Sequence, residues 1–523
     1  MKKQLFLLAI IIFSVFNLCF AQVTFQKSIG GAFPDWGNSV RQTTDGGYIL
    51  TGTTMSGSSV NFHAYLVKTN ANGDLFWTKT FYSNSDLRGL DIQQTIDGGY
   101  ILLGSLFYYA QPAILIKTNA TGDTTWTRDL TKWGNAYSVQ QTTDSGYIIT
   151  GSTLGDDFST GKDTSNITAL LLKTNPIGNI TWSKSYSGSK RFRYSGQSVQ
   201  QTNDKGYIVT GYTTIFGADS IDVYLLKTNA DGDTLWSRTF GGHRNDYGTS
   251  VKQTSDDGYI ITGYTNSFGA GRYDVYLIKT NSDGNIVWSK TYGGDWNDYG
   301  YSIQQTIDGG YIISGLTNSF GTNNGYLIKT DNLGNIEWSK TIGGGGSLSV
   351  DQTSDSGYIF TGQVISDAGN ENVLLVKTDQ MGNSGCNEAD ALTITKSATT
   401  KMSGTSIVVV SNSFTNTNLP CSIDSGIGTG SSLCTTVGLN EIKTGNSLLI
   451  SPNPSSGEFV ITFPGAINHG TIEIYTFLGE RVFSETVTLS SQKDVNLQNS
   501  APGIYFVKIL DGERRYSQKV MIE

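Results

Sequence analysis

Aspartates that recur in one kind of turn are the most frequent candidates for acid–base chemistry in this sequence. Each lies two residues after a Thr and two residues before the Gly of a Gly-Tyr pair. Glycoside hydrolysis needs two carboxyl groups that face each other across a bond. However, an Asp in a tight turn usually accepts hydrogen bonds from its own backbone, and a catalytic group need not be present seven times. We therefore predict a structural role for Asp45, Asp97, Asp144, Asp204, Asp256, Asp308 and Asp355.

Other catalytic patterns are missing from the sequence. Asp295 and Asp298 are the one acidic pair outside the repeated position that merits inspection, and we expect them to lie in a solvated loop. The three histidines, His63, His243 and His469, occupy unrelated positions. The sequence contains no G-x-S-x-G, no H-E-x-x-H, no phosphate loop and no calcium loop. It predicts no catalytic residue, no cofactor and no metal site.

Aromatic residues that directly follow an aspartate are better candidates for ligand binding. The pattern Asp-aromatic-Gly occurs at Asp35-Trp36-Gly37, Asp246-Tyr247-Gly248 and Asp298-Tyr299-Gly300. A ring beside a carboxylate can stack on a sugar or peptide while the carboxylate accepts hydrogen bonds. The alternative is that these rings pack inward. The candidate ligand-binding residues are Trp36, Tyr247, Tyr299, Asp246 and Asp298.

A tryptophan and a lysine also recur once per repeat. We expect the tryptophans to pack in the core, and the lysines to cover apolar surface with their stems while their charged ends stay in solvent. The tryptophans are Trp77, Trp126, Trp182, Trp236, Trp288 and Trp338. The lysines are Lys68, Lys117, Lys173, Lys227, Lys279, Lys329 and Lys377.

Four short strands per repeat are predicted to position these residues. In the copy at 249–294 they are Ser250–Gln253, Tyr259–Tyr264, Tyr273–Thr280 and Ile286–Tyr292. The second and third are apolar at nearly every position, which indicates a sheet covered on both faces. No segment has a helical period. A small antiparallel sheet stacked between neighbours is typical of a β-propeller blade.

The number of copies predicts how the ring closes. Seven Gly-Tyr turns recur about fifty residues apart, which indicates a repeat architecture. The fourth-strand Trp occurs only six times, but Val23–Ile29 matches Ile180–Tyr186, with Phe25 at the Trp position. A first strand that completes the last blade would join both ends of the ring and hide two sheet edges. We therefore predict an all-β fold in which residues 22–383 form a seven-bladed β-propeller of four-stranded blades, closed by the N-terminal strand.

The loops of such a ring differ between its two faces. Loops after the first and third strands are short and uniform, whereas loops after the second and fourth strands vary and include the insertion Gly155–Asn166. Binding residues on a rigid scaffold are usually carried by variable loops. We expect ligands on the face with variable loops, which is also the face of Trp36, Tyr247 and Tyr299.

Composition and the N-terminus indicate export. The 523 residues are 37% hydrophobic and 15% charged, with 63 glycines and a net charge of −8, which suits a turn-rich β protein and excludes a nucleic-acid-binding surface. Residues 1–21 combine Lys2-Lys3, an apolar run and a final Ala21, as a secretory signal peptide does. No other segment is long and apolar enough to cross a membrane, so we expect no transmembrane span in the mature chain.

Three cysteines would remain after removal of the signal peptide. Cys386, Cys421 and Cys434 all follow the last repeat. An exported chain can keep disulfides, and three cysteines allow one pair and one free thiol. The sequence leaves open which two form the pair.

The C-terminal quarter carries a second set of landmarks. Residues 384–446 are rich in Ser, Thr and Gly and are predicted to be a linker, and residues 447–523 a small β-sandwich domain. In the latter, Pro452-Asn453-Pro454, Leu-Gly479-Glu-Arg and Pro502-Gly503-Ile-Tyr505 follow in order. These motifs resemble the type A C-terminal sorting domain of the type IX secretion system of Bacteroidetes. The resemblance implies the type IX machinery as a partner, and a cell-surface or secreted location.

The repeats themselves resemble secreted bacterial β-propeller repeats of the T-x-D-G-G-Y-I…L-I-K-T…G-N…W type, a resemblance that is specific for fold and not for function. We expect an exported, non-catalytic recognition scaffold that binds an extracellular glycan or protein through the variable loops. The alternative is an extracellular polysaccharide hydrolase or lyase with carboxylates in its loops or central channel.

Overall fold

The structure is a computed structural model that describes two compact units, residues 22–435 and 436–522, with short gaps. The signal peptide predicted at residues 1–21 and the insertion Gly155–Asn166 lie outside the described residues. The gaps are 57–60, 84–85, 107–112, 131–133, 155–166, 188–192, 215–219, 366–368, 405–407, 412–421, 426–428, 433–448, 452, 454, 477–480, 498–499 and 512–513.

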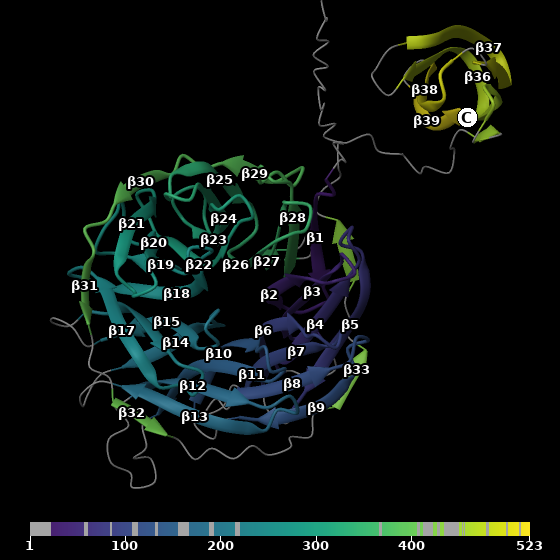
Figure 1. Ribbon diagram of the computed structural model, residues 1–523. Helices are drawn as coiled ribbons and strands as arrows, with labels where there is room; N and C mark the ends of the chain where they lie inside the picture. Colours follow the sequence, from purple (N-terminus) through teal and green to yellow (C-terminus); the bar gives the residue numbers. More distant parts are fainter. Residues whose placement is uncertain are drawn as a thin grey trace, which may run out of the picture. The chain divides into compact units, whose positions relative to one another are not determined.

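Seven antiparallel sheets form a ring in the first unit, which confirms the predicted propeller (Figure 1). In each blade the first strand lies at the centre of the ring and the fourth near the rim. Blade I contains β2 (Asp35–Gln42), β3 (Tyr48–Thr54), β4 (His63–Thr69) and β5 (Leu75–Tyr82). Blade II contains β6 (Leu87–Gln94), β7 (Tyr100–Leu106), β8 (Ala113–Thr118) and β9 (Thr124–Asp129). Blade III contains β10 (Gly134–Gln141), β11 (Tyr147–Leu154), β12 (Ile167–Thr174) and β13 (Ile180–Ser187).

The remaining blades follow in the same order. Blade IV contains β14 (Tyr194–Gln201), β15 (Tyr207–Thr213), β16 (Asp222–Thr228) and β17 (Thr234–Gly241). Blade V contains β18 (Asp246–Gln253), β19 (Tyr259–Thr265), β20 (Asp274–Thr280) and β21 (Ile286–Gly293). Blade VI contains β22 (Asp298–Gln305), β23 (Tyr311–Thr317), β24 (Asn324–Thr330) and β25 (Ile336–Ile342). Blade VII contains β26 (Ser347–Gln352), β27 (Tyr358–Ile365), β28 (Glu371–Thr378) and the N-terminal β1 (Phe25–Gly30).

The N-terminal strand closes the ring as predicted. β1 pairs with β28, with Phe25 opposite Lys377 and Ile29 opposite Val373. Phe25 is 6% exposed and meets Tyr48 of blade I edge-on, with ring centroids 5.9 Å apart. The same contact joins the fourth strand of each other blade to the second strand of the next, and it confirms the packing role predicted for the tryptophans. Those contacts are Trp77–Tyr100, Trp126–Tyr147, Trp182–Tyr207, Trp236–Tyr259, Trp288–Tyr311 and Trp338–Tyr358.

The turn aspartates have the structural role that the sequence predicts. In blade I, Asp45 Oδ1 accepts hydrogen bonds from Thr43 Oγ1 and the Gly47 amide. Burial acts to raise the pKa of Asp45, but the hydrogen bonds from Thr43, Lys68 and Gly47 outweigh it and hold that pKa below its usual value.

The expectation for the repeated lysines was wrong. The Lys68 side chain is buried, and its Nζ pairs with Asp45 at 2.9 Å and donates to the Thr69 carbonyl oxygen at 2.9 Å. The acceptors offered by the turn allow the ammonium group to leave water, which the apolar stem alone does not require. The other six lysines form the same pair with the turn aspartate of their blade.

A ring of glutamines joins the blades around the centre. The last Gln of each first strand accepts a hydrogen bond from a backbone amide in the tight turn of the preceding blade, at 2.7–2.9 Å. Because every described blade makes this contact, the first strands are fixed against one another at the channel wall. The acceptors are Gln42, Gln94, Gln141, Gln201, Gln253, Gln305 and Gln352.

The segment predicted as a linker instead forms a belt around the propeller. Among the described residues, six short strands add a fifth strand to the outer edge of six blades, while blade II has four (Figure 1). The belt runs opposite to the blade order, through blades VI, V, IV, III, I and VII. The unpaired amides and carbonyls of the fourth strands supply the reason, since an open edge accepts another strand of almost any composition. The belt strands are β29 (Glu388–Asp390), β30 (Ile394–Ser397), β31 (Lys401–Gly404), β32 (Val408–Ser411), β33 (Ser422–Ser425) and β34 (Thr429–Ser432).

The second unit is a separate all-β domain. Its strands are β35 (Leu449–Ser451), β36 (Glu458–Thr476), β37 (Arg481–Asn496), β38 (Gly503–Asp511) and β39 (Arg514–Ile522). The long β36 pairs with β35 through its first half and with β38 through its second half, and its register with β37 shifts between Thr462 and Ile467. Residues of both halves, such as Ile461 and Ile474, share one buried core. The part of the chain that the structure describes contains no helix that could span a membrane.

Candidate functional site

Six tyrosines gather on the face of the propeller that carries the variable loops. They come from the first strands of blades V and VI, the ends of the second strands of blades IV and V, and the loop before β20. We call this set the tyrosine patch. Every member is half-buried, so part of each ring faces solvent. The patch consists of Tyr212, Tyr247, Tyr264, Tyr273, Tyr299 and Tyr301.

The rings of the patch form one continuous cluster. Tyr264 lies at its centre, with its ring centroid 4.6 Å from that of Tyr247 and 4.9 Å from that of Tyr299. Tyr273 lies 5.7 Å from Tyr299 and 6.5 Å from Tyr247. The cluster therefore brings together two of the three aromatic residues that the sequence singles out.

The ends of the patch extend in two directions. Tyr212 continues it into blade IV, 5.4 Å from Tyr247, and Tyr301 stacks on Tyr299 at 6.1 Å and also lines the central channel. The sequence contained a signal for part of this set, since blades IV and V alone have Tyr after the second-strand Gly, at Tyr212 and Tyr264.

Trp36 lies outside the tyrosine patch. It belongs to blade I, where its Nε1 donates to Glu371 Oε2 at 2.5 Å and its ring lies 5.4 Å from that of Phe62. Phe62 is in turn covered by the Arg88 guanidinium at 4.9 Å. Trp36 is therefore half-buried in a local contact between blades VII and I, and we do not include it in the patch.

The side chains of Asp246 and Asp298 are buried and hydrogen-bonded within the fold. Both are 0% exposed. Asp298 accepts hydrogen bonds from the Gly294 amide and from Ser319 Oγ at 2.7 Å, and Asp246 accepts the equivalent bonds from Gly242 and Ser267. Burial raises the pKa of both carboxyl groups, and these hydrogen bonds partly offset it. Since Asp295 is exposed while Asp298 is buried, the two do not form an open pair of carboxylates.

Each of these buried aspartates instead has a buried carboxyl neighbour in the preceding blade. The two carboxylates meet at Gly241. A Cβ atom on that glycine would lie 2.2 Å from Asp222 Oδ1 and 2.7 Å from Asp246 Oδ2. Asp274 and Asp298 have the same relation to Gly293. Burial, together with the neighbouring carboxylate, raises the pKa of Asp222 to about 7.

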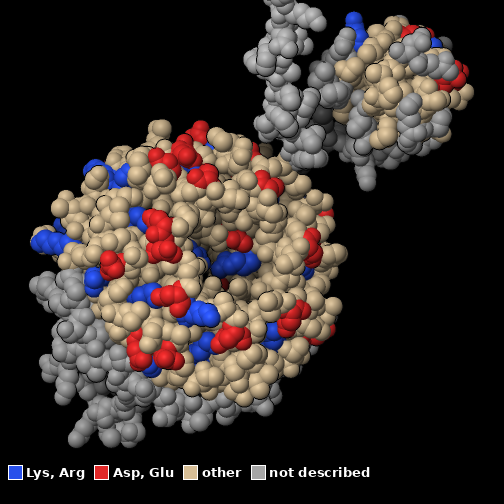
Figure 2. All heavy atoms as spheres, in the orientation of Figure 1, with Lys and Arg blue, Asp and Glu red and all other residues tan. Residues whose placement is uncertain are grey.

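The central channel contains the other polar cluster of the propeller. First-strand residues of all seven blades enclose a cavity of about 130 Å³. Charged atoms of both signs are visible in the central hollow of the ring (Figure 2). They matter because two channel positions hold Ser or Gln in most repeats, whereas Arg41, Asp91, Lys252 and Asp351 depart from that pattern.

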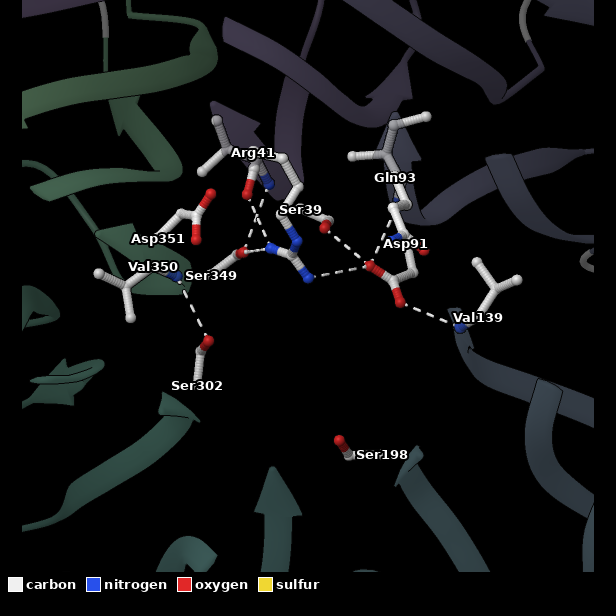
Figure 3. A network of polar contacts seen from close by, with 12 residues as sticks. Ser39, Arg41, Asp91, Gln93, Val139, Ser198, Ser302, Ser349, Val350 and Asp351 are labelled. Atoms are coloured by element: carbon white, nitrogen blue, oxygen red, sulfur yellow. Dashed lines mark hydrogen bonds and ion pairs between the residues drawn. The ribbon is translucent and has the colours of Figure 1, made fainter. Parts of the chain in front are cut away.

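Hydrogen bonds hold the channel carboxylates in place. Asp91 Oδ1 accepts from Ser39 Oγ at 2.8 Å and lies 3.5 Å from an Arg41 guanidinium nitrogen, and its Oδ2 accepts from the Val139 amide (Figure 3). Asp351 accepts from the Gln42 amide and from Gln304 Nε2 at 2.6 Å. These are two acidic residues at non-repeated positions, but each is committed to the wall. Among the residues described, no group of three or more His, Cys, Asp or Glu is placed to hold a metal ion.

The sorting motif residues that the structure describes hold the second unit together. Asn453 Oδ1 accepts from the Met521 amide at 2.9 Å, and the Tyr505 hydroxyl donates to the Ala501 carbonyl at 2.6 Å. Gly503 begins β38, directly after the exposed Pro502. Pro452, Pro454 and Gly479 lie outside the described residues.

Comparison with known families decides what the second unit is. Residues 449–523 match the secretion system C-terminal sorting domain. The chain is thus a β-propeller protein with a type IX sorting domain, and it is exported to the cell surface or secreted. The sorting domain accounts for the second unit and leaves the ligand of the propeller unassigned.

Solved structures are similar to part of this chain. The WD40 β-propeller domain of Doa1 is 11% identical, with a TM-score of 0.44, and the match covers 68% of this chain and 97% of that one. A protein of unknown function from Dyadobacter fermentans is 8% identical, with a TM-score of 0.41 and coverage of 68% and 97%. An α-L-arabinanase from Penicillium chrysogenum, solved with arabinobiose, is 11% identical, with a TM-score of 0.39 and coverage of 68% and 98%. A search of curated proteins gave no match.

Proposed function

We propose that this exported protein is a non-catalytic recognition scaffold that binds a glycan on the tyrosine patch. The observation that carries the proposal is the continuous cluster of half-buried rings centred on Tyr264, on the face with variable loops. Solvent-facing tyrosines present an apolar ring face beside a hydroxyl, and a sugar ring needs both. Five of the six rings are anchored on strands of blades IV to VI, so little side-chain freedom is lost when a ligand binds.

The loops next to the patch extend the same surface. Trp296, in the loop between blades V and VI, is 54% exposed, and the Arg272 guanidinium lies 5.2 Å from its ring centroid. Arg272 directly precedes Tyr273, and Gly271 closely approaches the backbone of Trp296. A second stacking platform therefore lies beside the first, which favours an extended chain of sugars over a single residue.

The runner-up, a polysaccharide hydrolase or lyase, has less support. It needs two carboxyl groups open to a bound chain. Of the carboxylates considered for that role, Asp298 is buried at the start of β22, Asp91 is bonded to the channel wall, and the exposed Asp295 is not paired with an open carboxylate. A protein ligand remains the other outcome that an experiment must separate.

A glycan array probed with the purified exported protein tests the proposal. We expect binding to a defined class of glycan, and we expect Tyr247→Ala combined with Tyr299→Ala to weaken it at least tenfold. Phe76→Ala is the control, because Phe76 is 68% exposed beside the uniform turns, on the opposite face. The matching Tyr→Phe variants keep the rings and remove the hydroxyls, so they separate stacking from hydrogen bonding. Binding that survives the double Ala variant in a folded protein would contradict the patch as the site.

A further inference from the structure

A cavity lies between blades VI and VII on the face of the propeller that carries the short, uniform turns. Its volume of about 370 Å³ is above the roughly 300 Å³ at which pockets begin to enclose a small ligand. The half-buried Trp338 and the exposed Ile307 and Met381 are among the residues that line it. Ile307 belongs to the turn after β22 and Met381 to the turn after β28. The cavity and the tyrosine patch are therefore on opposite faces.

The ring of Trp338 lacks a cation that five other blades place over the ring at this position. A basic residue follows the ring by two positions in every blade. In blade VI this residue is Lys340, which pairs with Asp390 of the belt strand β29 at 2.7 Å and does not line the cavity. In blade I, Lys79 stays at the junction with the next blade by pairing with Asp123. The charged groups of the other five lie 5.2–6.0 Å from the ring centroids of Phe25, Trp126, Trp182, Trp236 and Trp288.

The wall of the cavity carries an excess of negative charge. The Lys329 ammonium group lies 2.9 Å from a carboxylate oxygen of Asp308 and 2.8 Å from one of Glu337, and all three residues line the cavity. Each of the other six repeated lysines has one carboxylate partner among the described residues. Burial and then the charges of Asp308, Glu337 and Asp379 raise the pKa of Tyr358, which also lines the cavity. Because two carboxylates share one ammonium group, the site can accept a further positive charge.

Another junction shows how the chain itself fills a similar place. Between blades IV and V, burial and then the charges of three aspartates raise the pKa of Tyr259. There the Arg238 guanidinium lies 5.3 Å from the ring centroid of Trp236 and donates to the Asp283 carbonyl oxygen. An acidic junction is thus occupied by a cation that lies over the ring. Between blades VI and VII the corresponding cation, Lys340, is held by the belt, and the junction contains a cavity.

We propose that this cavity binds a small organic cation, with its ammonium or guanidinium group over the Trp338 ring beside Glu337 and its apolar part against Ile307 and Met381. A cation is attracted to the face of a tryptophan ring, and the attraction is larger where water is excluded. A hydrogen bond from the cation to the Glu337 carboxylate is stronger than one from a neutral group. This site goes beyond glycan recognition and does not depend on it, because the tyrosine patch lies on the opposite face.

Isothermal titration calorimetry of the purified exported protein with 2-phenylethylamine tests the site. At neutral pH this amine joins an ammonium group to an apolar ring, and 2-phenylethanol is its uncharged counterpart. We expect saturable binding of the amine and about tenfold weaker binding of the alcohol, since the alcohol gains neither the ring attraction nor the charge-assisted hydrogen bond. Equal binding of the two probes, or no saturable binding of the amine, would overturn the proposal.

Glu337→Thr removes the excess charge with a residue that the repeat already uses, since Thr125 and Thr181 occupy this position in blades II and III. The variant should bind the amine about tenfold more weakly and melt as the natural protein does, because Lys329 keeps its pair with Asp308. Asp283→Asn is the matched control, because it removes a carboxylate from an exposed turn of the same face and should keep the affinity. Unchanged affinity in Glu337→Thr would overturn the proposal.

Trp338→Phe tests the placement of the cation over the ring. Phe25 fills the same position in blade VII, so the variant should fold, and a phenyl ring attracts a cation less than an indole ring does. We expect it to weaken binding of the amine more than binding of the alcohol. Trp236→Phe is the control, because Arg238 already covers that ring. Equal affinity for the amine in the two variants would contradict the placement. Glycan binding, measured in Glu337→Thr, should be unchanged, which separates failure of this site from failure of the tyrosine patch.

Discussion

At the scale of single residues, the buried carboxyl pairs make the propeller sensitive to pH. Asp222 and Asp274 each face a second aspartate, and burial followed by that neighbour raises the pKa of Asp222 to about 7, while the pKa of Asp274 is raised to about 6, mainly by burial. In the unfolded chain both ionise near pH 3.8. Between these values the folded state binds more protons than the unfolded state, so stability falls as the pH rises.

Asp222→Asn should remove this loss of stability at higher pH. The variant should gain melting temperature relative to the natural protein as the pH rises from about 4 to about 7, with a gain in free energy of unfolding of about 4 kcal/mol at most. Thermal melts at pH 4, 5, 6, 7 and 8 measure it. An Asn–Asp pair of this kind already exists between blades VII and I. There Asn372 and Asp35 flank Gly30 as Asp222 and Asp246 flank Gly241. A difference in melting temperature between the two proteins that does not change with pH would show that Asp222 and Asp246 do not share a proton.

Residue roles that depend on the local turn could be predicted from the sequence, and roles that depend on the neighbouring blade could not. The turn position of Asp45 was enough to predict its hydrogen bonds to Thr43 and Gly47. Nothing near Lys68 in the sequence reveals that its ammonium group turns back to that aspartate, 23 residues earlier. Likewise, Asp246 and Tyr247 are adjacent in sequence, but successive side chains of a strand point to opposite faces. The Asp246 carboxylate therefore points toward the neighbouring loop, and the Tyr247 ring points to the surface.

At the scale of elements, β1 is the strand on which ring closure depends. Phe25→Ala should lower the free energy of unfolding by about 3–5 kcal/mol, because it empties the site that Trp fills in the other blades. Val23→Ala is the control, since Val23 is exposed and precedes the strand. Deletion of residues 23–29 should cost more than Phe25→Ala, because the edge of β28 is then left open. Melting temperatures within two degrees of the natural protein for both changes would show that the ring does not need β1.

A disulfide is expected to fasten the belt. Cys386 is disulfide-bonded, and its carbonyl oxygen accepts a hydrogen bond from Gln26 of β1. β34 also lies on β1, with Ser432 opposite Lys27 and the chain running toward Gln26. We therefore predict Cys434 as the partner, which closes a loop of about 48 residues and contributes about 4 kcal/mol in the chain-entropy account.

Peptide mapping without reduction measures this pairing. We expect a linked pair of peptides that contain Cys386 and Cys434, with Cys421 open to alkylation. β33 places Ser422 opposite Tyr82 in blade I, away from the blade VII contact of Cys386. Recovery of a Cys386–Cys421 peptide would contradict the prediction.

The belt also shows where prediction of elements from sequence stops. The blades could be predicted because their strands bury two apolar faces and leave a strong pattern. The belt strands join an existing edge through backbone hydrogen bonds and a few surface side-chain contacts such as the Lys340–Asp390 ion pair, and all four residues of β30 are exposed. A strand that buries no face needs no apolar period, so the Ser- and Thr-rich segment reads as a linker.

At the scale of the whole molecule, the propeller and the sorting domain have separate cores. The second unit has its own buried cluster, which includes Ile461, Ile474 and Val507. Deletion of residues 447–523 should therefore leave the melting transition of the propeller unchanged while the protein stays inside the outer membrane. Cell fractionation and surface labelling measure the location. Normal appearance of the shortened protein on the surface would show that export does not depend on the sorting domain.

The central claim is that the tyrosine patch binds a glycan, and the most direct measurement is the dissociation constant of one array-selected glycan for three proteins. These are the natural protein, the Tyr247→Ala, Tyr299→Ala double variant and Phe76→Ala, each shown by its melting curve to be folded. We predict that the double variant binds at least tenfold more weakly, which corresponds to about 1.4 kcal/mol or more, and that Phe76→Ala binds as the natural protein does. Equal dissociation constants for all three proteins would contradict the account.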